Sequence, residues 1–175
     1  MKLKVLFFLL WVLISQGQAQ NPLKAITQAE IKAILVKEIK PNCESAYPKN
    51  QWVYINEFVL VDLTGDGVLE ALVTASTCTT GTAGADILRV YAKNKTKGIH
   101  ELKIDEPKEF NGKEIWSGHG GGFYYTTRNN TLIGVYIPYG PGGKTSLLGI
   151  ERELRYQWDA QRRMFVLTGV QDKPM

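Results

Sequence analysis

Cysteine and histidine are both scarce in this chain of 175 residues, with two of each. No Cys-x-x-Cys pair is present and no histidine lies near either cysteine, which argues against a zinc site. A Ser-His-acid triad has little support either, because His100 and His119 are the only histidines and no serine stands in a Gly-x-Ser-x-Gly motif. We therefore predict that the protein is not an enzyme.

The chain also lacks an apolar run long enough to cross a bilayer. The run over residues 5–14 has 10 residues, whereas a membrane-spanning helix needs about 20. Lys2 and Lys4 precede this run, and small residues follow it. We predict a cleaved signal peptide over residues 1–19 and location in the periplasm or outside the cell, with a signal anchor as the alternative. No cysteine closely follows the run, so lipid attachment is not expected. No other stretch is apolar enough to cross a bilayer, so membrane insertion after cleavage is not expected either.

Strong charge of one sign is missing as well. The whole chain carries a net charge of +4, and removal of the leader with its two lysines leaves +2 on residues 20–175. That charge is too small to indicate a nucleic acid or a membrane surface as the partner. Residues 20–175 are enough for a single domain with its own core.

The two cysteines, Cys43 and Cys78, both lie after the leader. In an exported protein a cysteine pair is most simply a disulfide, so we predict a bond between them. It would close a loop of about 35 residues and stabilise the fold by roughly 3–4 kcal/mol. The alternative is two unpaired, buried thiols.

One segment has the pattern of an amphipathic helix. Thr27 is a favourable N-cap residue, and Glu30, three positions later, completes a capping box. Ile26 and Ile31 stand where a hydrophobic staple places its two members. Apolar residues then recur at helical spacing as far as Pro41, which is expected to end the helix. The predicted helix covers about 27–40 and packs on a sheet.

After residue 50 the pattern becomes that of β-strands, with short aromatic and β-branched runs between turn residues. Asn129-Asn130 fits a hairpin turn, because both residues tolerate positive φ. The tail over residues 171–175 is expected to fray. The predicted fold class is α+β, a mainly antiparallel sheet over about 51–170 with one N-terminal helix. The expected strands are 52–61, 69–77, 86–93, 100–104, 114–118, 123–127, 131–138, 148–158 and 164–170.

An oxygen-rich loop joins the first two expected strands. Oxygen-bearing groups occur at loop positions 1, 3, 5, 7 and 9, the spacing by which a short loop surrounds Ca²⁺. Gly67 at position 6 allows the sharp turn. The predicted ligands are Asp62, Thr64, Asp66 and Glu70 through their side chains, and Val68 through its carbonyl.

Two other kinds of loop share part of this pattern. An EF-hand needs a bidentate acid at position 12 and helices on both sides, but Val73 occupies position 12 and the flanks are strand-like, so an EF-hand is excluded. The second interpretation is a turn without metal, in which Asp62 and Asp66 accept hydrogen bonds from backbone amides. This alternative stays open beside the Ca²⁺ site.

Residues 61–71 resemble the FG-GAP/VCBS repeats found in integrin α-chain propellers and in many exported bacterial proteins. The pattern of these repeats is Asp-x-Asp/Asn-x-Asp-Gly-x-x-Asp/Glu between two strands, which implies a β-hairpin with a structural Ca²⁺. Thr64 stands where the family usually has Asp or Asn, so the expected dissociation constant is about 10⁻⁴–10⁻³ M. The acidic loop occurs once, and a complete propeller is not expected.

The predicted function is an exported, non-enzymatic module for binding or structure, stabilised by Ca²⁺. Its partner class stays open between protein and carbohydrate. One alternative is a periplasmic hydrolase that uses His119, at the start of a His-Gly-Gly-Gly loop, as base. Another is an inhibitor of a periplasmic or host enzyme. Aromatic residues gather in the second half of the chain, where they fit either a ligand groove or a sheet core.

Overall fold

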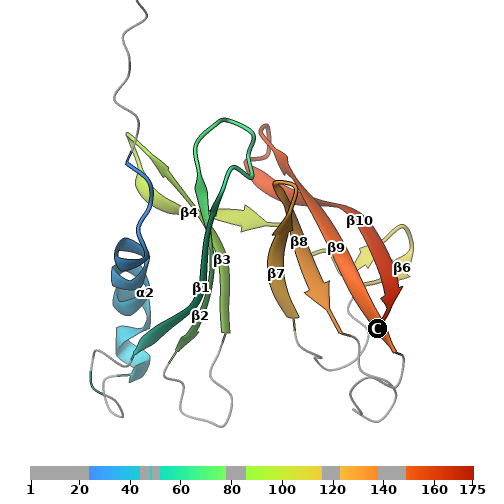
Figure 1. The fold of residues 1–175 in the computed structure, drawn as a ribbon, viewed down its shortest axis with the longest axis horizontal. Helices are drawn as coiled ribbons and strands as arrows, with labels where there is room; N and C mark the ends of the chain where they lie inside the picture. The colour runs from blue at the N-terminus through green and yellow to red at the C-terminus, as the bar shows by residue number, and fades with distance from the viewer. Residues whose placement is uncertain (1–23, 44–47, 49–51, 78–85, 116–122, 138–148) are drawn as a thin grey trace, which may run out of the picture.

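The computed structural model describes residues 24–43, 48, 52–77, 86–115, 123–137 and 149–175. Within them the chain forms one helix and ten strands (Figure 1). In chain order these are α2 (Gln28–Cys43), β1 (Val53–Val61), β2 (Glu70–Thr77), β3 (Asp86–Asn94), β4 (Gly98–Ile104), β5 (Glu109–Phe110), β6 (Lys113–Glu114), β7 (Phe123–Arg128), β8 (Thr131–Tyr136), β9 (Ile150–Asp159) and β10 (Met164–Pro174).

Eight of the strands form one sheet, in the order β1-β2-β3-β4-β10-β9-β8-β7. Neighbouring strands are antiparallel except for β4 and β10, which are parallel. The sheet is therefore two four-stranded meanders joined at one parallel seam. At the seam Lys103 is the partner of Met164 and Ile104 of Phe165, and the N–H of Asp105 donates to the Phe165 carbonyl (2.8 Å). The whole sheet curls into an open half-barrel (Figure 1).

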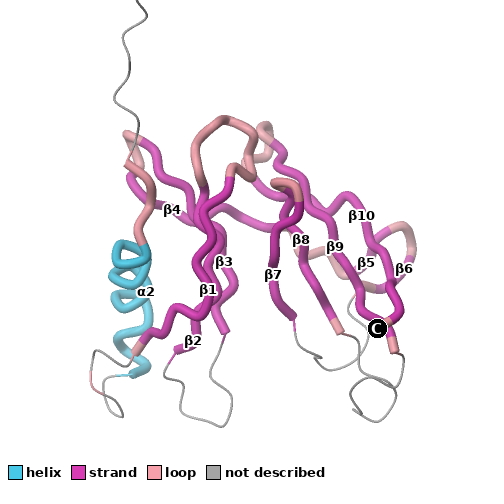
Figure 2. The backbone as a smooth tube through the Cα atoms, in the orientation of Figure 1, coloured by secondary structure: helices cyan, strands magenta, loops and turns pink. Residues whose placement is uncertain are grey.

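Strand β2 is buried on both of its faces. Ala71 and Val73 belong to a hydrophobic cluster shared with α2, whereas Leu72, on the opposite face, belongs to a cluster shared with the second meander. Figure 2 shows the helix on one side of β1 to β3 and strands β7 and β8 on the other. A strand covered on both faces has an almost continuous apolar sequence, which explains the lack of clear alternation in β2.

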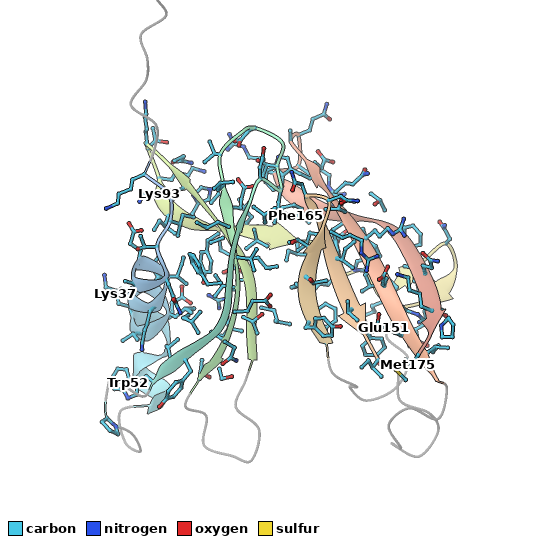
Figure 3. The ribbon with its side chains drawn as sticks, viewed as in Figure 1. Lys37, Trp52, Lys93, Glu151, Phe165 and Met175 are labelled. Carbon is cyan, nitrogen blue, oxygen red and sulfur yellow. The ribbon has the colours of Figure 1, made fainter. Side chains whose placement is uncertain are left out.

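The hydrophobic cluster between the two meanders holds the half-barrel together. Val90 and Leu102 reach it from the first meander, and Leu154 and Phe165 from the second. Figure 3 shows Phe165 where the two meanders meet. Because the seam itself has only two paired positions on each strand, we infer that burial of this cluster contributes most of the free energy that joins the meanders.

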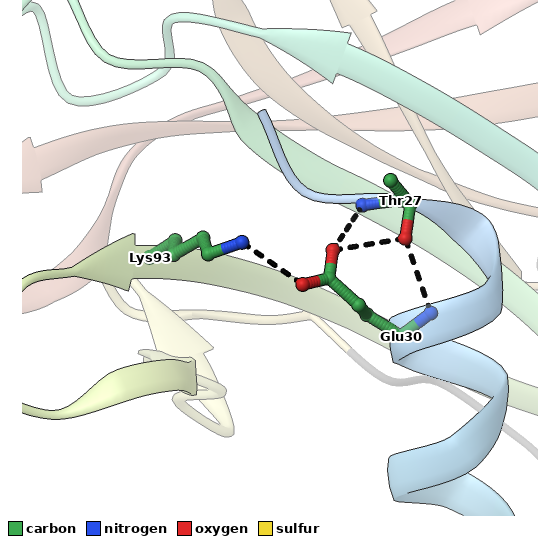
Figure 4. Close-up of polar contacts among 3 residues, drawn as sticks. All are labelled: Thr27, Glu30 and Lys93. Carbon is green, nitrogen blue, oxygen red and sulfur yellow. Dashed lines mark hydrogen bonds and ion pairs between the residues drawn. The ribbon is translucent and has the colours of Figure 1, made fainter. Parts of the chain in front are cut away.

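The capping box predicted for the helix is confirmed. The Glu30 carboxylate accepts hydrogen bonds from the N–H and the hydroxyl of Thr27 (both 2.8 Å), and the N–H of Glu30 donates to the Thr27 hydroxyl (3.3 Å; Figure 4). Lys93 of β3 pairs with the same carboxylate (2.9 Å). The hydrogen bond from Lys93 is the largest cause that lowers the pKa of Glu30 to about 2, followed by those from Thr27. Ile26 and Ile31 are both buried.

The end of the helix differs from the prediction. Helix α2 continues through Pro41 to Cys43, three residues beyond the predicted end at residue 40. Proline fixes φ near the helical value and lacks only its own N–H, so within the last turn it removes one helical hydrogen bond without ending the helix.

Two asparagine-containing turns join neighbouring strands. Asn129 and Asn130 have φ of 51° and 57°, which confirms the predicted turn between β7 and β8. The hairpin of β5 and β6 was not predicted, although Asn111-Gly112 at its turn, with φ of 52° and 74°, is a favoured pair for such a turn. The strand expected over residues 114–118 is described only at its start, in β6.

The prediction of a frayed tail is wrong. Strand β10 remains paired with β9 as far as Pro174, and the N–H of Met175 donates to the Gly149 carbonyl (2.8 Å). Arg152 and Asp172 form two charge-assisted hydrogen bonds across the same strands (2.6 and 2.9 Å). These bonds to β9 and to Gly149 fix the tail, so it does not behave as a free end. The α+β class is confirmed, and the sheet is not a complete propeller.

Candidate functional site

The predicted ligand loop connects β1 to β2, and the register that pairs Val61 with Glu70 sets its two ends side by side. Glu70 is buried, with 1% of its surface exposed. Its Oε2 accepts hydrogen bonds from the N–H of Leu63 (2.8 Å) and Thr64 (3.1 Å), and its Oε1 accepts one from the Thr64 hydroxyl (3.3 Å). The Glu70 side chain, at the end of the loop, therefore fixes Leu63 and Thr64 at its beginning.

Asp62 and Asp66 hold the middle of the loop in a similar way. The carboxylate of Asp62 accepts hydrogen bonds from the N–H of Gly65 (2.7 Å) and Gly67 (3.0 Å), and that of Asp66 accepts one from the N–H of Val68 (2.8 Å). Both glycines have positive φ, 76° and 82°. Only glycine adopts this conformation without strain, which is why the turn can be so tight.

The loop concentrates negative charge around a buried carboxylate. Burial raises the pKa of Glu70, and the neighbouring charges of Asp66 and Asp62 raise it further, while the hydrogen bonds from Leu63 and Thr64 oppose the rise. Among the described residues, none of the three carboxylates has an ion-pair partner. The loop therefore contains like charges that no side chain among the described residues pairs with.

The structure brings the predicted side-chain ligands Asp62, Thr64, Asp66 and Glu70 into one loop, with carboxylates bonded to the loop's own amides. This is the hydrogen bonding expected of the turn without metal. In the part of the chain that is described, no group of three or more His, Cys, Asp or Glu is arranged to hold a metal ion. The donor set nevertheless fits a hard cation chemically, because it contains oxygen atoms alone. The Ca²⁺ site stays a prediction.

A cleft of about 710 Å³ adjoins the loop. Its walls come from the β1–β2 loop, the β3–β4 hairpin and the β9–β10 turn, of which the first and last lie at the same end of the molecule (Figure 1). Local sequence patterns did not predict this cleft, because its walls are far apart in the chain. The charged and aromatic residues that line it include Asp66, Glu70, Lys97, Glu101, Lys103, Trp158, Arg162 and Arg163.

Several sequence-based predictions fall outside the described residues. His119 is one of them, so the hydrolase alternative gains nothing from the structure. His100 lines the cleft, with its Nδ1 at 3.3 Å from the Gly98 carbonyl. The predicted disulfide and the signal peptide also lie outside, since neither the side chain of Cys43 nor any part of Cys78 or residues 1–19 is described.

Most of the aromatic residues described in the second half of the chain are core residues. Tyr125 and Tyr136 are buried, and Tyr125 makes edge contacts with Phe123 (centroids 4.9 Å apart) and Tyr156 (6.0 Å). Tyr124 is the exception, with 42% of its surface exposed. For the buried tyrosines, packing explains the aromatic composition better than a ligand groove.

No family model, no curated protein and no solved structure matches the chain. The resemblance of residues 61–71 to FG-GAP/VCBS repeats therefore rests on the motif itself and stays a prediction. Within the described residues, no helix is long and apolar enough to cross a membrane.

Proposed function

We propose that this protein is an exported, non-enzymatic binding module in which Ca²⁺ reinforces the β1–β2 loop. The observation that carries the proposal is the buried Glu70 carboxylate, which lies beside Asp62 and Asp66 without an ion-pair partner among the described residues. A divalent cation held by these side chains, the Thr64 hydroxyl and the Val68 carbonyl would offset their mutual repulsion. The role of the cation would be to compensate the negative charge of the loop and to make the loop rigid.

The cleft supports the binding part of the proposal. Its volume of about 710 Å³ lies within the range of roughly 300–1,000 Å³ that is typical of ligand sites. Thr64, Asp66, Val68 and Glu70 form one of its walls. A loop made rigid by its own hydrogen bonds and by Ca²⁺ would keep that wall in place, which lowers the entropy lost when a ligand binds.

A thermal melt of the exported protein in Ca²⁺ and in chelator tests the metal. At about ten times a dissociation constant of 10⁻³ M, Ca²⁺ should stabilise the fold by about 1.4 kcal/mol, a rise of roughly 3–6 °C in Tm. Mg²⁺ should do less, because it gives up its hydration water reluctantly. The substitution Asp66→Ala should abolish the rise.

Asp159→Ala is the matched control for this experiment. Asp159 accepts hydrogen bonds from the N–H of Gln161 and Arg162 (both 2.9 Å) in the β9–β10 turn, so its loss also breaks side-chain bonds that close a turn. This variant should melt earlier than wild type and still respond to Ca²⁺. Equal Tm values for wild type in Ca²⁺ and in chelator would refute the metal proposal.

A further inference from the structure

The cleft beside the loop is lined by basic side chains for which the described part of the chain supplies no partner. Lys97, Lys103, Arg162 and Arg163 line it and are exposed. Within the described residues none of these four side chains forms an ion pair or hydrogen bond. Like charges gathered without partners repel one another, and an anion between them would relieve that repulsion.

The four cations without partners among the described residues outnumber the three carboxylates that line the same cleft, Asp66, Glu70 and Glu101. Asp66 bonds to the N–H of Val68, and Glu70 is buried against the amides of its own loop. Glu101 pairs with Arg89 (3.4 Å). The groups left to meet a ligand are therefore mainly positive.

The parallel seam brings cations from distant parts of the chain to one cleft. Lys103 of β4 is the register partner of Met164 in β10, the residue after Arg163, and both Lys103 and Arg163 line the cleft. Lys97 comes from the β3–β4 turn and lines the same cleft. Cations of two hairpins thus surround one space, which suits a ligand with several negative groups.

Arg163 has a φ of 54°. The left-handed region is unfavourable for a residue with a long side chain. Glycine or asparagine would fill this turn position with less strain. Strained positions cluster at functional sites, where a particular side chain is needed despite the strain. The conformation of Arg163 therefore marks the basic end of the cleft independently of its charge.

Trp158 also lines the cleft, and its ring lies against Phe165 with centroids 5.2 Å apart. We propose that the cleft binds an anionic saccharide, whose sulfate, phosphate or carboxylate groups meet Lys97, Lys103, Arg162 and Arg163 while a sugar ring contacts Trp158. Arginine pairs well with such planar or tetrahedral anions, and an indole offers a flat apolar surface to a sugar. This inference rests on the binding part of the proposed function and not on Ca²⁺.

Calorimetric titration tests the inference with four ligands: a sulfated hexasaccharide, an oligogalacturonate, a neutral hexasaccharide and polyphosphate. At about 25 mM salt, where screening is weak, at least one of the two anionic saccharides should bind and the neutral one should not. Arg162→Ala with Arg163→Ala should weaken binding about tenfold or more, the loss of at least one charge-assisted contact. Trp158→Leu should weaken saccharide binding and leave polyphosphate unaffected.

Arg163→Gly separates binding from folding, because glycine relieves the positive φ while removing the charge. This variant should keep or raise Tm and still bind more weakly. Lys32→Gln with Lys37→Gln on α2 removes the same charge away from the cleft (Lys37 is labelled in Figure 3) and should change affinity less than about twofold. Three results would overturn the inference. They are no binding of either anionic saccharide, equal losses of affinity in the two double variants, and tighter binding of polyphosphate than of any saccharide. Repeating the titration in chelator separates this inference from the Ca²⁺ proposal. Saccharide binding should persist in chelator, so failure of the Ca²⁺ proposal leaves the inference intact.

Discussion

Arg128, at the end of β7, reaches past β8 to form two hydrogen bonds with Glu153 of β9 (2.8 and 3.2 Å). Lys173 of β10 pairs with the same carboxylate. The Glu153 side chain is only 2% exposed, so one nearly buried charge ties three strands of the second meander together. The hydrogen bonds from Arg128 and Lys173 lower the pKa of Glu153 to about 2.

Glu153→Gln should destabilise the fold by about 1–3 kcal/mol at neutral pH, because it removes hydrogen bonds to a charged group. The folded pKa lies below the ordinary value of 4.5, so this stability is present above that pH and is lost as pH falls toward about 2. Urea unfolding of both proteins between pH 7 and pH 3 should show a shrinking difference. Glu109→Gln, at an exposed residue, should change little. A difference that grows in acid would contradict the assignment.

Glu70 should show the opposite dependence on pH. Its pKa is raised above 4.5 in the fold, so the folded state takes up a proton more readily than the unfolded state and gains stability as pH falls toward that raised pKa. In chelator, the Tm of wild type relative to Glu70→Gln should therefore rise as pH falls from neutral toward 4.5. Added Ca²⁺ should reduce this rise. A constant Tm difference in chelator across the interval would show that the carboxylate does not titrate as described.

The cap of α2 gives a local test of stability. Thr27→Ala removes the hydroxyl that bonds to the N–H and the carboxylate of Glu30, and should cost about 0.5–2 kcal/mol in free energy of unfolding. Thr27→Ser keeps the oxygen and should recover most of that loss. Chemical denaturation measures both variants. If serine were as destabilising as alanine, the hydroxyl would not be the cause.

Two glycines allow strain to be separated from crowding. A Cβ added at Gly67 would touch nothing within 4 Å, but φ there is 82°, so Gly67→Ala should destabilise by about 1 kcal/mol through backbone strain alone. Gly169 does not have positive φ and an added Cβ would make an ordinary contact with Arg155 (3.8 Å). Gly169→Ala should therefore be neutral or slightly stabilising. Similar Tm changes in both variants would rule out this explanation.

Local features of the fold were predictable because neighbouring residues determine them. Thr27 and Glu30 define the helix start between themselves, and Asn129-Asn130 defines a turn from its own backbone preferences. The tail was mispredicted because its order depends on pairing with β9, and its composition does not encode that partner. The seam between Lys103 and Met164 was not predicted for the same reason.

The candidate site also has one part that the sequence predicts and one part that it does not. The acidic loop was predictable because all of its predicted ligands lie between Asp62 and Glu70, and their spacing carries the information. The cleft was not, because Lys103 and Arg163 come to line one cleft only through the long-range pairing of β4 with β10. The contiguous loop motif predicts only one wall of the cleft, and the walls from the β3–β4 hairpin and the β9–β10 turn could not be predicted from it.

The parallel seam also has a consequence for how the chain folds. Within each meander, consecutive strands pair through connections that stay local, whereas the seam closes a loop of about sixty residues before its few hydrogen bonds can form. Non-local pairing slows folding through the entropy of loop closure. We expect the two meanders to form early and the β4–β10 junction to form last. The rate at which this junction of two residue pairs forms then sets how long the apolar faces of both meanders stay exposed and prone to aggregation.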